Sequence, residues 1–403
     1  MRVIPQPELI LLPSLAAHED ENGSLFLTQK YLDGVAEFEK LWPGKVTSLI
    51  TVDKTPNSEM DLVEVDLNVS PPALERRPTA AEDLVRRLQN VTAVLAHLAP
   101  QEAETAELCH QMQVPIVFTS EYTPKTEAQI VDATTTNPVL RVRRKLWIRQ
   151  AEKTRVHILR NYAAGLQCSG TPTYDHYKAL VPDAHLFFDN RVRNAHVISE
   201  DDLAAKAKRV KEGNPLRLVF GGRLVAMKGV QDLPKVARAL RELNIPFTLD
   251  IVGSGPLQES LQNEVSAMGD PSIRLRPAMD FRTGWVPFLR EEADLFICCH
   301  PQGDPSSTYP EVMSCGTPIV GYDNEAWAGV LRKSGAGWSV PLQDSDALAK
   351  KVAELHVARD EVAQMAVLSR DFALEHCFER TEVQRVRHLM QIALPEMQTV
   401  SKS

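Results

Sequence analysis

Short apolar runs alternate with helical patterns through the second half of this 403-residue chain, and this alternation restricts the fold more than any other feature. Strands are expected over residues 216–220, 248–252, 295–299, 318–320 and 338–340. Helices are expected between them, over residues 230–243, 256–268, 309–315 and 346–355. Strands and helices at this spacing indicate a parallel, doubly wound α/β sheet, because each parallel connection uses a crossover helix.

The first half repeats the pattern less regularly, with strands expected over residues 8–12, 46–52, 93–97, 115–119 and 186–188. The chain length favours two domains of ordinary size. We expect an N-terminal domain over residues 1–200 and a C-terminal domain over 201–375, two Rossmann-like units that face each other across a cleft. The helical tail, residues 376–403, either closes the second domain or crosses back to the first.

Composition excludes several classes of protein. The net charge of −8 argues against nucleic acid as the main partner. The six cysteines form no CxxC pair, which favours reduced thiols and a cytoplasmic location. No apolar run reaches the length of a membrane span. The Asp344-Ser345-Asp346 segment resembles a metal-binding Asp-x-Asp motif, but it precedes a helical run and is interpreted as a helix cap, so no metal site is expected.

A glycine-rich turn follows the first strand of the second half. Gly221 and Gly222 expose backbone N–H groups at the end of that strand, and a helix expected from Gly229 directs its positive end into the same space. Arg223 and Lys228 add fixed positive charge. This combination suits a diphosphate, while a tight turn with two solvated bases is the alternative interpretation.

Two further loops should meet this turn at the carboxyl edge of the sheet. The next strand ends in Gly253 and Gly255, and Pro256 suits the first turn of the helix that follows. A later strand continues into an acidic, hydroxyl-rich loop and then a short helix that Gly316 ends. Open α/β sheets bind ligands in such a crevice.

Three motifs in this order, GGRLVAMKG, IVGSGP and DPSSTYPEVMSCGTPIVGYDNEA, resemble the donor-binding half of glycosyltransferase family 4 over residues 216–337. The resemblance implies the GT-B fold, a retaining mechanism, a UDP- or GDP-sugar donor and no further cofactor. It implies that Arg223 and Lys228 contact the donor diphosphate and that Glu311 binds the ribose. The remaining donor-binding candidates are Gly222, Gly253, Gly255, Ser306, Ser307 and Thr308.

The chain departs from the family pattern at the first acid of the acidic, hydroxyl-rich loop, which we call the donor loop. That position is Gly303 here, and Asp304 follows it, so Asp304 is the candidate catalytic acid that holds the donor sugar. His97, at the end of an expected strand, resembles the family's cleft histidine and is the second catalytic candidate, with a structural role as the alternative. Gly23 and Ser24 precede a helical pattern and are candidates for an acceptor-side loop, or form a plain helix cap.

The resemblance thus implies transfer of a sugar from a nucleoside-diphosphate sugar to a glycan or lipid-linked acceptor, with retention of configuration. A non-catalytic nucleotide-sugar-binding scaffold is the first alternative, because the first acid is missing. Another GT-B reaction, such as sugar epimerisation or phosphorolysis, is the second.

A basic segment from Arg141 to Arg160 stands out from the acidic whole. It carries eight bases and one acid, Glu152, and its apolar residues fall near helical spacing. An amphipathic helix of this kind predicts weak peripheral contact with the anionic inner face of a membrane. A solvated helix that packs its apolar side on the first domain is the alternative.

Overall fold

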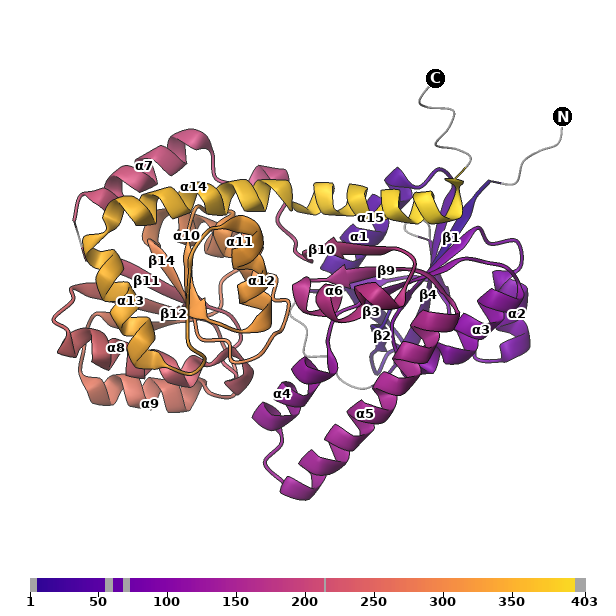
Figure 1. The fold of residues 1–403 in the computed structure, drawn as a ribbon, viewed down its shortest axis with the longest axis horizontal. Helices are drawn as coiled ribbons and strands as arrows, with labels where there is room; N and C mark the ends of the chain where they lie inside the picture. Colours follow the sequence, from indigo (N-terminus) through magenta and orange to yellow (C-terminus); the bar gives the residue numbers. More distant parts are fainter. Residues whose placement is uncertain (1–5, 55–60, 68–72, 214, 396–403) are drawn as a thin grey trace.

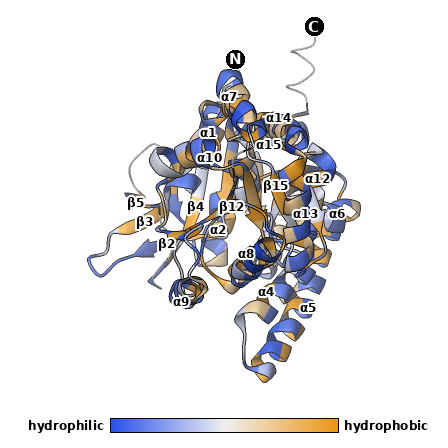
Figure 2. Ribbon diagram, turned by 90° about the vertical axis from the view of Figure 1, so that its left-hand side faces the viewer, coloured by the Kyte–Doolittle hydropathy of each residue, from blue (hydrophilic) through white to orange (hydrophobic). Residues whose placement is uncertain are grey.

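The computed structural model contains two α/β domains that lie side by side and are connected along one edge by two consecutive C-terminal helices, α14 (Arg359–Glu375) and α15 (Phe378–Ala393) (Figure 1). It describes residues 6–54, 61–67, 73–213 and 215–395. The predicted fold class is confirmed, because each domain is built on its own largely parallel, Rossmann-like sheet. Figure 2 shows the apolar residues concentrated in the central strands, and more hydrophilic residues on the surrounding helices.

The C-terminal sheet has six strands, all parallel, in the order β13-β12-β11-β14-β15-β16. They are β11 (Leu216–Gly221), β12 (Phe247–Val252), β13 (Ile273–Arg276), β14 (Leu295–Cys298), β15 (Ile319–Tyr322) and β16 (Trp338–Val340). The strand order reverses between β11 and β14, and this reversal leaves a crevice beyond their carboxyl ends.

Helices cover both faces of this sheet. They are α7 (Glu200–Lys211), α8 (Leu233–Glu242), α9 (Gln258–Met268), α10 (Val286–Glu292), α11 (Thr308–Met313), α12 (Glu325–Ser334), α13 (Ser345–Val357) and α14 (Arg359–Glu375). The helix expected from residue 230 begins three residues later, because 3₁₀ turns occupy Ala226–Lys228 and Val230–Asp232. Asp344 caps α13 by accepting the Ala347 N–H at 2.8 Å, which confirms the cap interpretation.

Among the described residues, the N-terminal sheet has ten strands. Its parallel part runs β10-β9-β8-β7-β1-β4-β2, with β6 also parallel to β4, and the antiparallel strands β3 and β5 extend it beyond β2. The strands are β1 (Glu8–Leu12), β2 (Ala16–Glu19), β3 (Leu25–Thr28), β4 (Lys45–Asp53), β5 (Leu62–Val65), β6 (Leu74–Arg76), β7 (Ala93–His97), β8 (Ile116–Ser120), β9 (Ala163–Ser169) and β10 (Ala184–Phe187). The helices are α1 (Gln29–Leu41), α2 (Ala81–Leu88), α3 (Ala103–Gln111), α4 (Pro124–Thr134), α5 (Pro138–Asn161) and α6 (Thr171–Tyr177).

The C-terminal helix α15 (Phe378–Ala393) packs on the N-terminal domain, as the yellow helix at the top of Figure 1 shows. Its Val386 and Leu389 are buried in one apolar cluster with Val35 and Phe38 of α1. Burial of four such side chains holds the two domains together through the tail, at roughly 1.5 to 3 kcal/mol for each fully buried side chain.

Candidate functional site

A cleft of about 500 Å³ lies between the two domains, at the point where the C-terminal strand order reverses. The N-terminal domain and the connection to the second domain supply Thr28, Lys30, Asp61, Glu121, Tyr122, Asp189 and Arg191. The C-terminal domain supplies the ends of β11 and β12 and the loop after β14. The cleft therefore brings together nine of the predicted residues: Gly222, Arg223, Lys228, Gly253, Asp304, Ser306, Ser307, Thr308 and Glu311.

The glycine loops are in direct contact with one another. A Cβ atom at Gly253 would lie 1.9 Å from the Gly222 carbonyl oxygen, so no larger residue fits there. Gly255, also predicted to bind the donor, is not among the residues that line the cleft. It packs behind the loop, where a Cβ would lie 2.7 Å from the carbonyl oxygen of Leu224. Its role in this structure is close backbone packing.

Lys228 and Arg223 occupy different environments. Lys228 is 8% exposed, and its Nζ donates to Asp304 Oδ2 at 2.9 Å and to Ser306 Oγ at 3.1 Å. Gly229, with φ +67°, allows the turn beside Lys228 to lie against the backbone just beyond β14, since a Cβ at Gly229 would lie 1.9 Å from the Cys299 carbonyl oxygen. Arg223 is exposed, and no hydrogen bond or ion pair of its guanidinium occurs within the described residues.

The structure explains the displaced acid of the donor loop. The Gly303 N–H donates to Gln129 Oε1 at 3.2 Å, and Thr126 Oγ1 donates to the Gly303 carbonyl at 3.4 Å. A Cβ at position 303 would lie 2.7 Å from a carboxylate oxygen of Glu325, so a side chain there would point at α4 and α12. Asp304, the next residue, lines the cleft instead.

Glu311 is buried on α11 and faces the cleft. Arg191 Nε donates to Glu311 Oε1 at 3.0 Å, and the Arg191 guanidinium lies 4.2 Å from the centre of the Phe281 ring. Burial raises the pKa of Glu311, although Arg191 and Lys30 oppose this shift. Arg191 did not emerge from the sequence, because it lies in the connection between domains and no local motif marks it.

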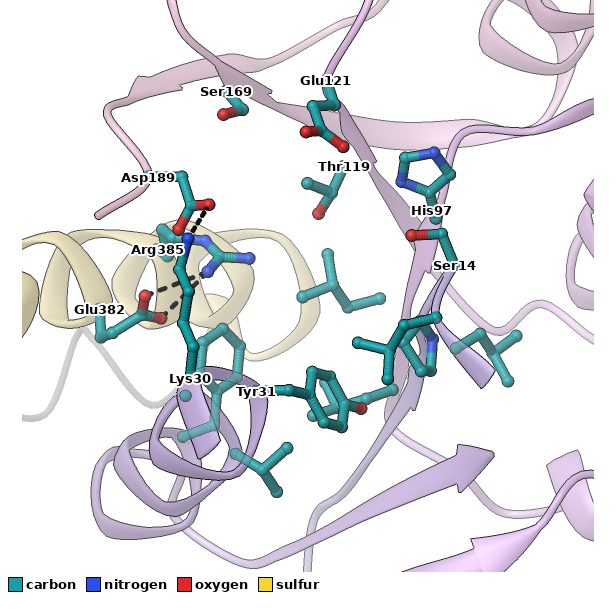
Figure 3. Close-up of a pocket in the computed structure, with 18 of the residues that line it drawn as sticks. Ser14, Lys30, Tyr31, His97, Thr119, Glu121, Ser169, Asp189, Glu382 and Arg385 are labelled. Atoms are coloured by element: carbon teal, nitrogen blue, oxygen red, sulfur yellow. Dashed lines mark hydrogen bonds and ion pairs between the residues drawn. The ribbon is translucent and has the colours of Figure 1, made fainter. Parts of the chain in front are cut away.

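A second pocket of about 310 Å³ opens in the N-terminal domain and adjoins the cleft (Figure 3). Thr28, Lys30, Glu121 and Asp189 line both. Lys30 Nζ is 2.6 Å from Asp189 Oδ2. The walls are mainly apolar residues of β1, β7 and α1, and α15 closes one side with Phe378, Glu382 and Arg385.

His97 lies in this second pocket, at the end of β7, and does not line the cleft. Burial, and secondarily the charge of Arg155, lowers its pKa to about 4. A pKa this low keeps the imidazole neutral at neutral pH. Glu121 stands at the junction of the two spaces, and the enclosing protein, together with Asp189, raises its pKa.

Gly23 and Ser24, predicted to form an acceptor-side loop, are not among the residues that line the cleft or the second pocket. They lie in the turn of the β2–β3 hairpin, where the Ser24 N–H donates to Asp20 Oδ1 at 2.8 Å and Ser24 Oγ donates to Glu64 Oε1 at 2.8 Å. They border a surface hollow apart from the cleft. The helix expected from residue 25 begins at Gln29, because residues 25–28 pair as β3 with β5. Its N-terminal residues Thr28 and Lys30 reach the cleft instead.

Within the described residues, no group of three or more His, Cys, Asp and Glu side chains is arranged to hold a metal ion.

Comparison with known proteins connects the C-terminal domain to sugar transfer. Residues 201–366 match the family model of glycosyl transferases group 1. A segment of 178 residues is 24% identical to a putative colanic acid biosynthesis glycosyltransferase, WcaL, of Escherichia coli, covering 42% of this chain and 43% of the relative. A segment of 204 residues is 30% identical to a GDP-mannose-dependent alpha-(1-6)-phosphatidylinositol monomannoside mannosyltransferase of Mycolicibacterium smegmatis, covering 47% and 51%. The chain thus spans about half the length of these curated relatives.

Solved structures match nearly the whole chain. Anabaena Alr3699/HepE in complex with UDP has a TM-score of 0.63 at 13% identity, covering 96% of this chain and 99% of that one. The lipopolysaccharide outer core galactosyltransferase WaaB in its apo form has a TM-score of 0.62 at 12% identity, covering 95% and 99%. At this identity the likeness shows the fold, which is the two-domain GT-B arrangement predicted from the three motifs.

Proposed function

We propose that this chain is a retaining glycosyltransferase that binds a nucleoside-diphosphate sugar in the cleft and an acceptor in the adjoining N-terminal pocket. One observation carries the proposal. Two cations, Arg223 and Lys228, and two acids, Asp304 and Glu311, converge on a single cleft at the reversal of strand order, and this cleft continues into a second pocket. The match of residues 201–366 to group 1 glycosyl transferases supports the same assignment.

The cations act on the leaving group. When the bond between the sugar C1 and the diphosphate oxygen breaks, negative charge develops on that oxygen, and Arg223 and Lys228 stabilise it more strongly than they stabilise the bound substrate. The acceptor oxygen then bonds to C1 on the face that the diphosphate leaves. Its proton passes to the departing phosphate oxygen, so no protein base is required.

Asp304 changes partners when the donor binds. In the structure its carboxylate accepts a hydrogen bond from Lys228 Nζ at 2.9 Å. A diphosphate competes for the Lys228 ammonium and releases Asp304 to accept a hydrogen bond from a sugar hydroxyl. Glu311 gives up its contact with Arg191 and accepts hydrogen bonds from the two ribose hydroxyls instead. Asp304→Asn should therefore lower kcat by about 10- to 100-fold with less effect on nucleotide affinity.

Relatives and neighbours give the substrate classes. HepE was solved with UDP and with UDP-glucose, and the mannosyltransferase relative is named as GDP-mannose-dependent. UDP- and GDP-sugars are therefore the donors that we propose, with no further cofactor and no metal. A glycan or a lipid-linked sugar is the proposed acceptor.

A thermal-shift panel of UDP- and GDP-sugars tests the assignment, because a ligand that binds only the native state raises the unfolding temperature. We expect either the UDP-sugars or the GDP-sugars to raise Tm. We also expect the protein to transfer the sugar of that donor slowly to water or to a glycan acceptor. NMR of the product then shows its anomeric configuration. Absence of any shift with saturating donors would contradict the donor site.

A non-catalytic scaffold is the second candidate, and Gly303 is the observation that favours it. A donor that raises Tm but is neither hydrolysed nor transferred to any glycan acceptor would favour the scaffold.

A further inference from the structure

The hairpin of α4 and α5 projects from the molecule as an arm, below both domains in Figure 1. Helix α5 is 24 residues long. Its second half packs on the N-terminal domain through Ile158 and Leu159, whereas the half that begins at Pro138 extends away from the sheet. We call residues 138–149 the arm tip.

The arm tip exposes an unusual concentration of apolar side chains. Five of the ten large apolar side chains that are exposed among the described residues lie within these twelve positions: Val139, Leu140, Val142, Leu146 and Trp147. Val139 is 74% exposed and Trp147 is 56% exposed. Val139, Val142 and Leu146 recur at spacings of three and four residues, and Leu140 lies seven residues before Trp147, so all five share one side of the helix. Figure 2 shows apolar and hydrophilic segments interleaved along this helix.

The bases of the segment divide into paired and free groups. Arg155 is buried and donates to both oxygens of Glu127, at 2.8 and 2.6 Å, so it does not belong to the surface patch expected from the sequence. Asp132 lies 2.6 Å from Lys145 and 3.7 Å from Arg141. Arg143 and Arg149 are exposed, with no ion pair or hydrogen bond of their side chains within the described residues.

An apolar face that carries the unpaired Arg143 within it and the unpaired Arg149 at its edge fits one kind of partner best. Trp and aliphatic side chains insert at the boundary of a bilayer, and neighbouring Arg side chains bind anionic headgroups. Association with a second copy through the same face would bury Arg143 and Arg149 of both copies, and the arm tip contains no acid that could pair with them. We propose that the arm tip docks on an anionic lipid bilayer by shallow insertion of these apolar side chains.

Within the described residues no helix is long and apolar enough to cross a membrane, so the proposed contact is interfacial.

Docking would also set the orientation of the cleft. The base of the arm, helix α4, contacts the donor loop through Thr126 and Gln129, which hydrogen-bond to Gly303 beside Asp304. A bilayer that holds the arm tip therefore fixes the distance between its surface and the cleft. Delivery of a lipid-linked acceptor to the cleft rests on the proposed transferase function, whereas bilayer binding does not.

Flotation of the full chain with vesicles of phosphatidylcholine and 30% phosphatidylglycerol tests the proposal. We expect binding in low salt, little binding to pure phosphatidylcholine, and a loss of most binding in 1 M salt, where the screening length falls to about 3 Å. The double variant Arg143→Gln and Arg149→Gln should bind on the order of 25-fold more weakly, at roughly fivefold for each charge. Exposed lysines of the other domain, changed as Lys333→Gln and Lys350→Gln, give a charge-matched control that should bind like the wild type.

Tryptophan emission supplies a second readout. On binding, the exposed Trp147 should shift to shorter wavelength and become protected from acrylamide, and Trp147→Ala should remove this signal and weaken flotation. Val357→Ala, at an apolar side chain that is 82% exposed on the other domain, is the matched control.

Three outcomes would overturn the proposal. They are no flotation with anionic vesicles at low salt, unaltered flotation of the double arginine variant, and a dimer in solution that Trp147→Ala converts to a monomer, which would assign the face to a second copy. Donor-induced Tm shifts, measured without vesicles, show separately whether the cleft assignment fails.

Discussion

Replacement of Lys228 by Met, compared with Arg223 by Ala, separates binding of the diphosphate from stability of the fold. Both cations line the cleft, but only Lys228 is buried and paired with an acid, at 2.9 Å from Asp304. Each variant removes one charge-assisted contact to the donor, which contributes about 1.5 to 3 kcal/mol. Donor Kd should therefore rise roughly 10- to 150-fold in both variants.

Stability should differ between the two variants. Lys228→Met leaves the Asp304 carboxylate without its cation at a site where both side chains are about nine-tenths buried. Removing one partner of a buried ion pair costs about 3 to 5 kcal/mol, and the remaining access to the cleft places this site at the lower end. Arg223→Ala removes an exposed side chain and should change the unfolding free energy by less than about 0.5 kcal/mol.

Calorimetric titration with UDP and GDP measures the affinities, and urea unfolding without ligand measures the stabilities. Adding Asp304→Asn to Lys228→Met should recover most of the lost stability, because the uncompensated charge is removed, but it should not recover donor affinity. Donor affinity within twofold of the wild type in both single variants would refute the diphosphate assignment. Equal stability of the two single variants would refute the importance of the buried pair.

Three further predictions concern other parts of the structure. Glu311→Gln should weaken donor binding about fivefold, because a neutral amide replaces a charged acceptor. Burial raises the pKa of Glu311, so on acidification the donor Kd of the wild type should begin to rise at a higher pH than it would with a glutamate of ordinary pKa. A donor Kd that stays constant from about pH 8 to about pH 4 would contradict this. Burial lowers the pKa of His97 to about 4, so the protein should lose stability as the pH falls from about 6.5 towards 4, because the imidazole is protonated in the unfolded state but not in the folded state. His97→Gln should flatten this part of the pH dependence of the unfolding free energy, measured by denaturant unfolding. Gly229→Ala should destabilise the fold by about 2 to 4 kcal/mol, because φ is +67° and the added methyl would meet the Cys299 carbonyl, and a loss below 1 kcal/mol in urea would show that the loop relaxes.

The sequence specified the donor half of the cleft because its elements are marked by local patterns. Apolar runs that end in glycine predict parallel strands, and the carboxyl ends of neighbouring parallel strands meet at one edge. Gly222, Lys228 and Asp304 therefore come together without any knowledge of long-range contacts, and the structure places all three in the cleft. The edge strand β13 escaped prediction because it has only four residues, two of them arginines that pair with Asp250 of β12, so it forms no apolar run.

Tertiary structure decided what depends on pairing between distant segments. Gly23 and Ser24 were assigned to a helix terminus, but the pairing of residues 25–28 with β5 turned that region into a hairpin. Arg191 and Glu311 are 120 residues apart, and Lys30 and Asp189 are 159 apart, so only tertiary packing brings each pair together. Likewise, Arg155 is buried and paired with Glu127, whereas Arg143 is exposed, although the sequence alone placed both arginines in the same basic segment. The physical reason is that local patterns determine which face an element buries, whereas the partner of a polar side chain depends on which other element packs against it.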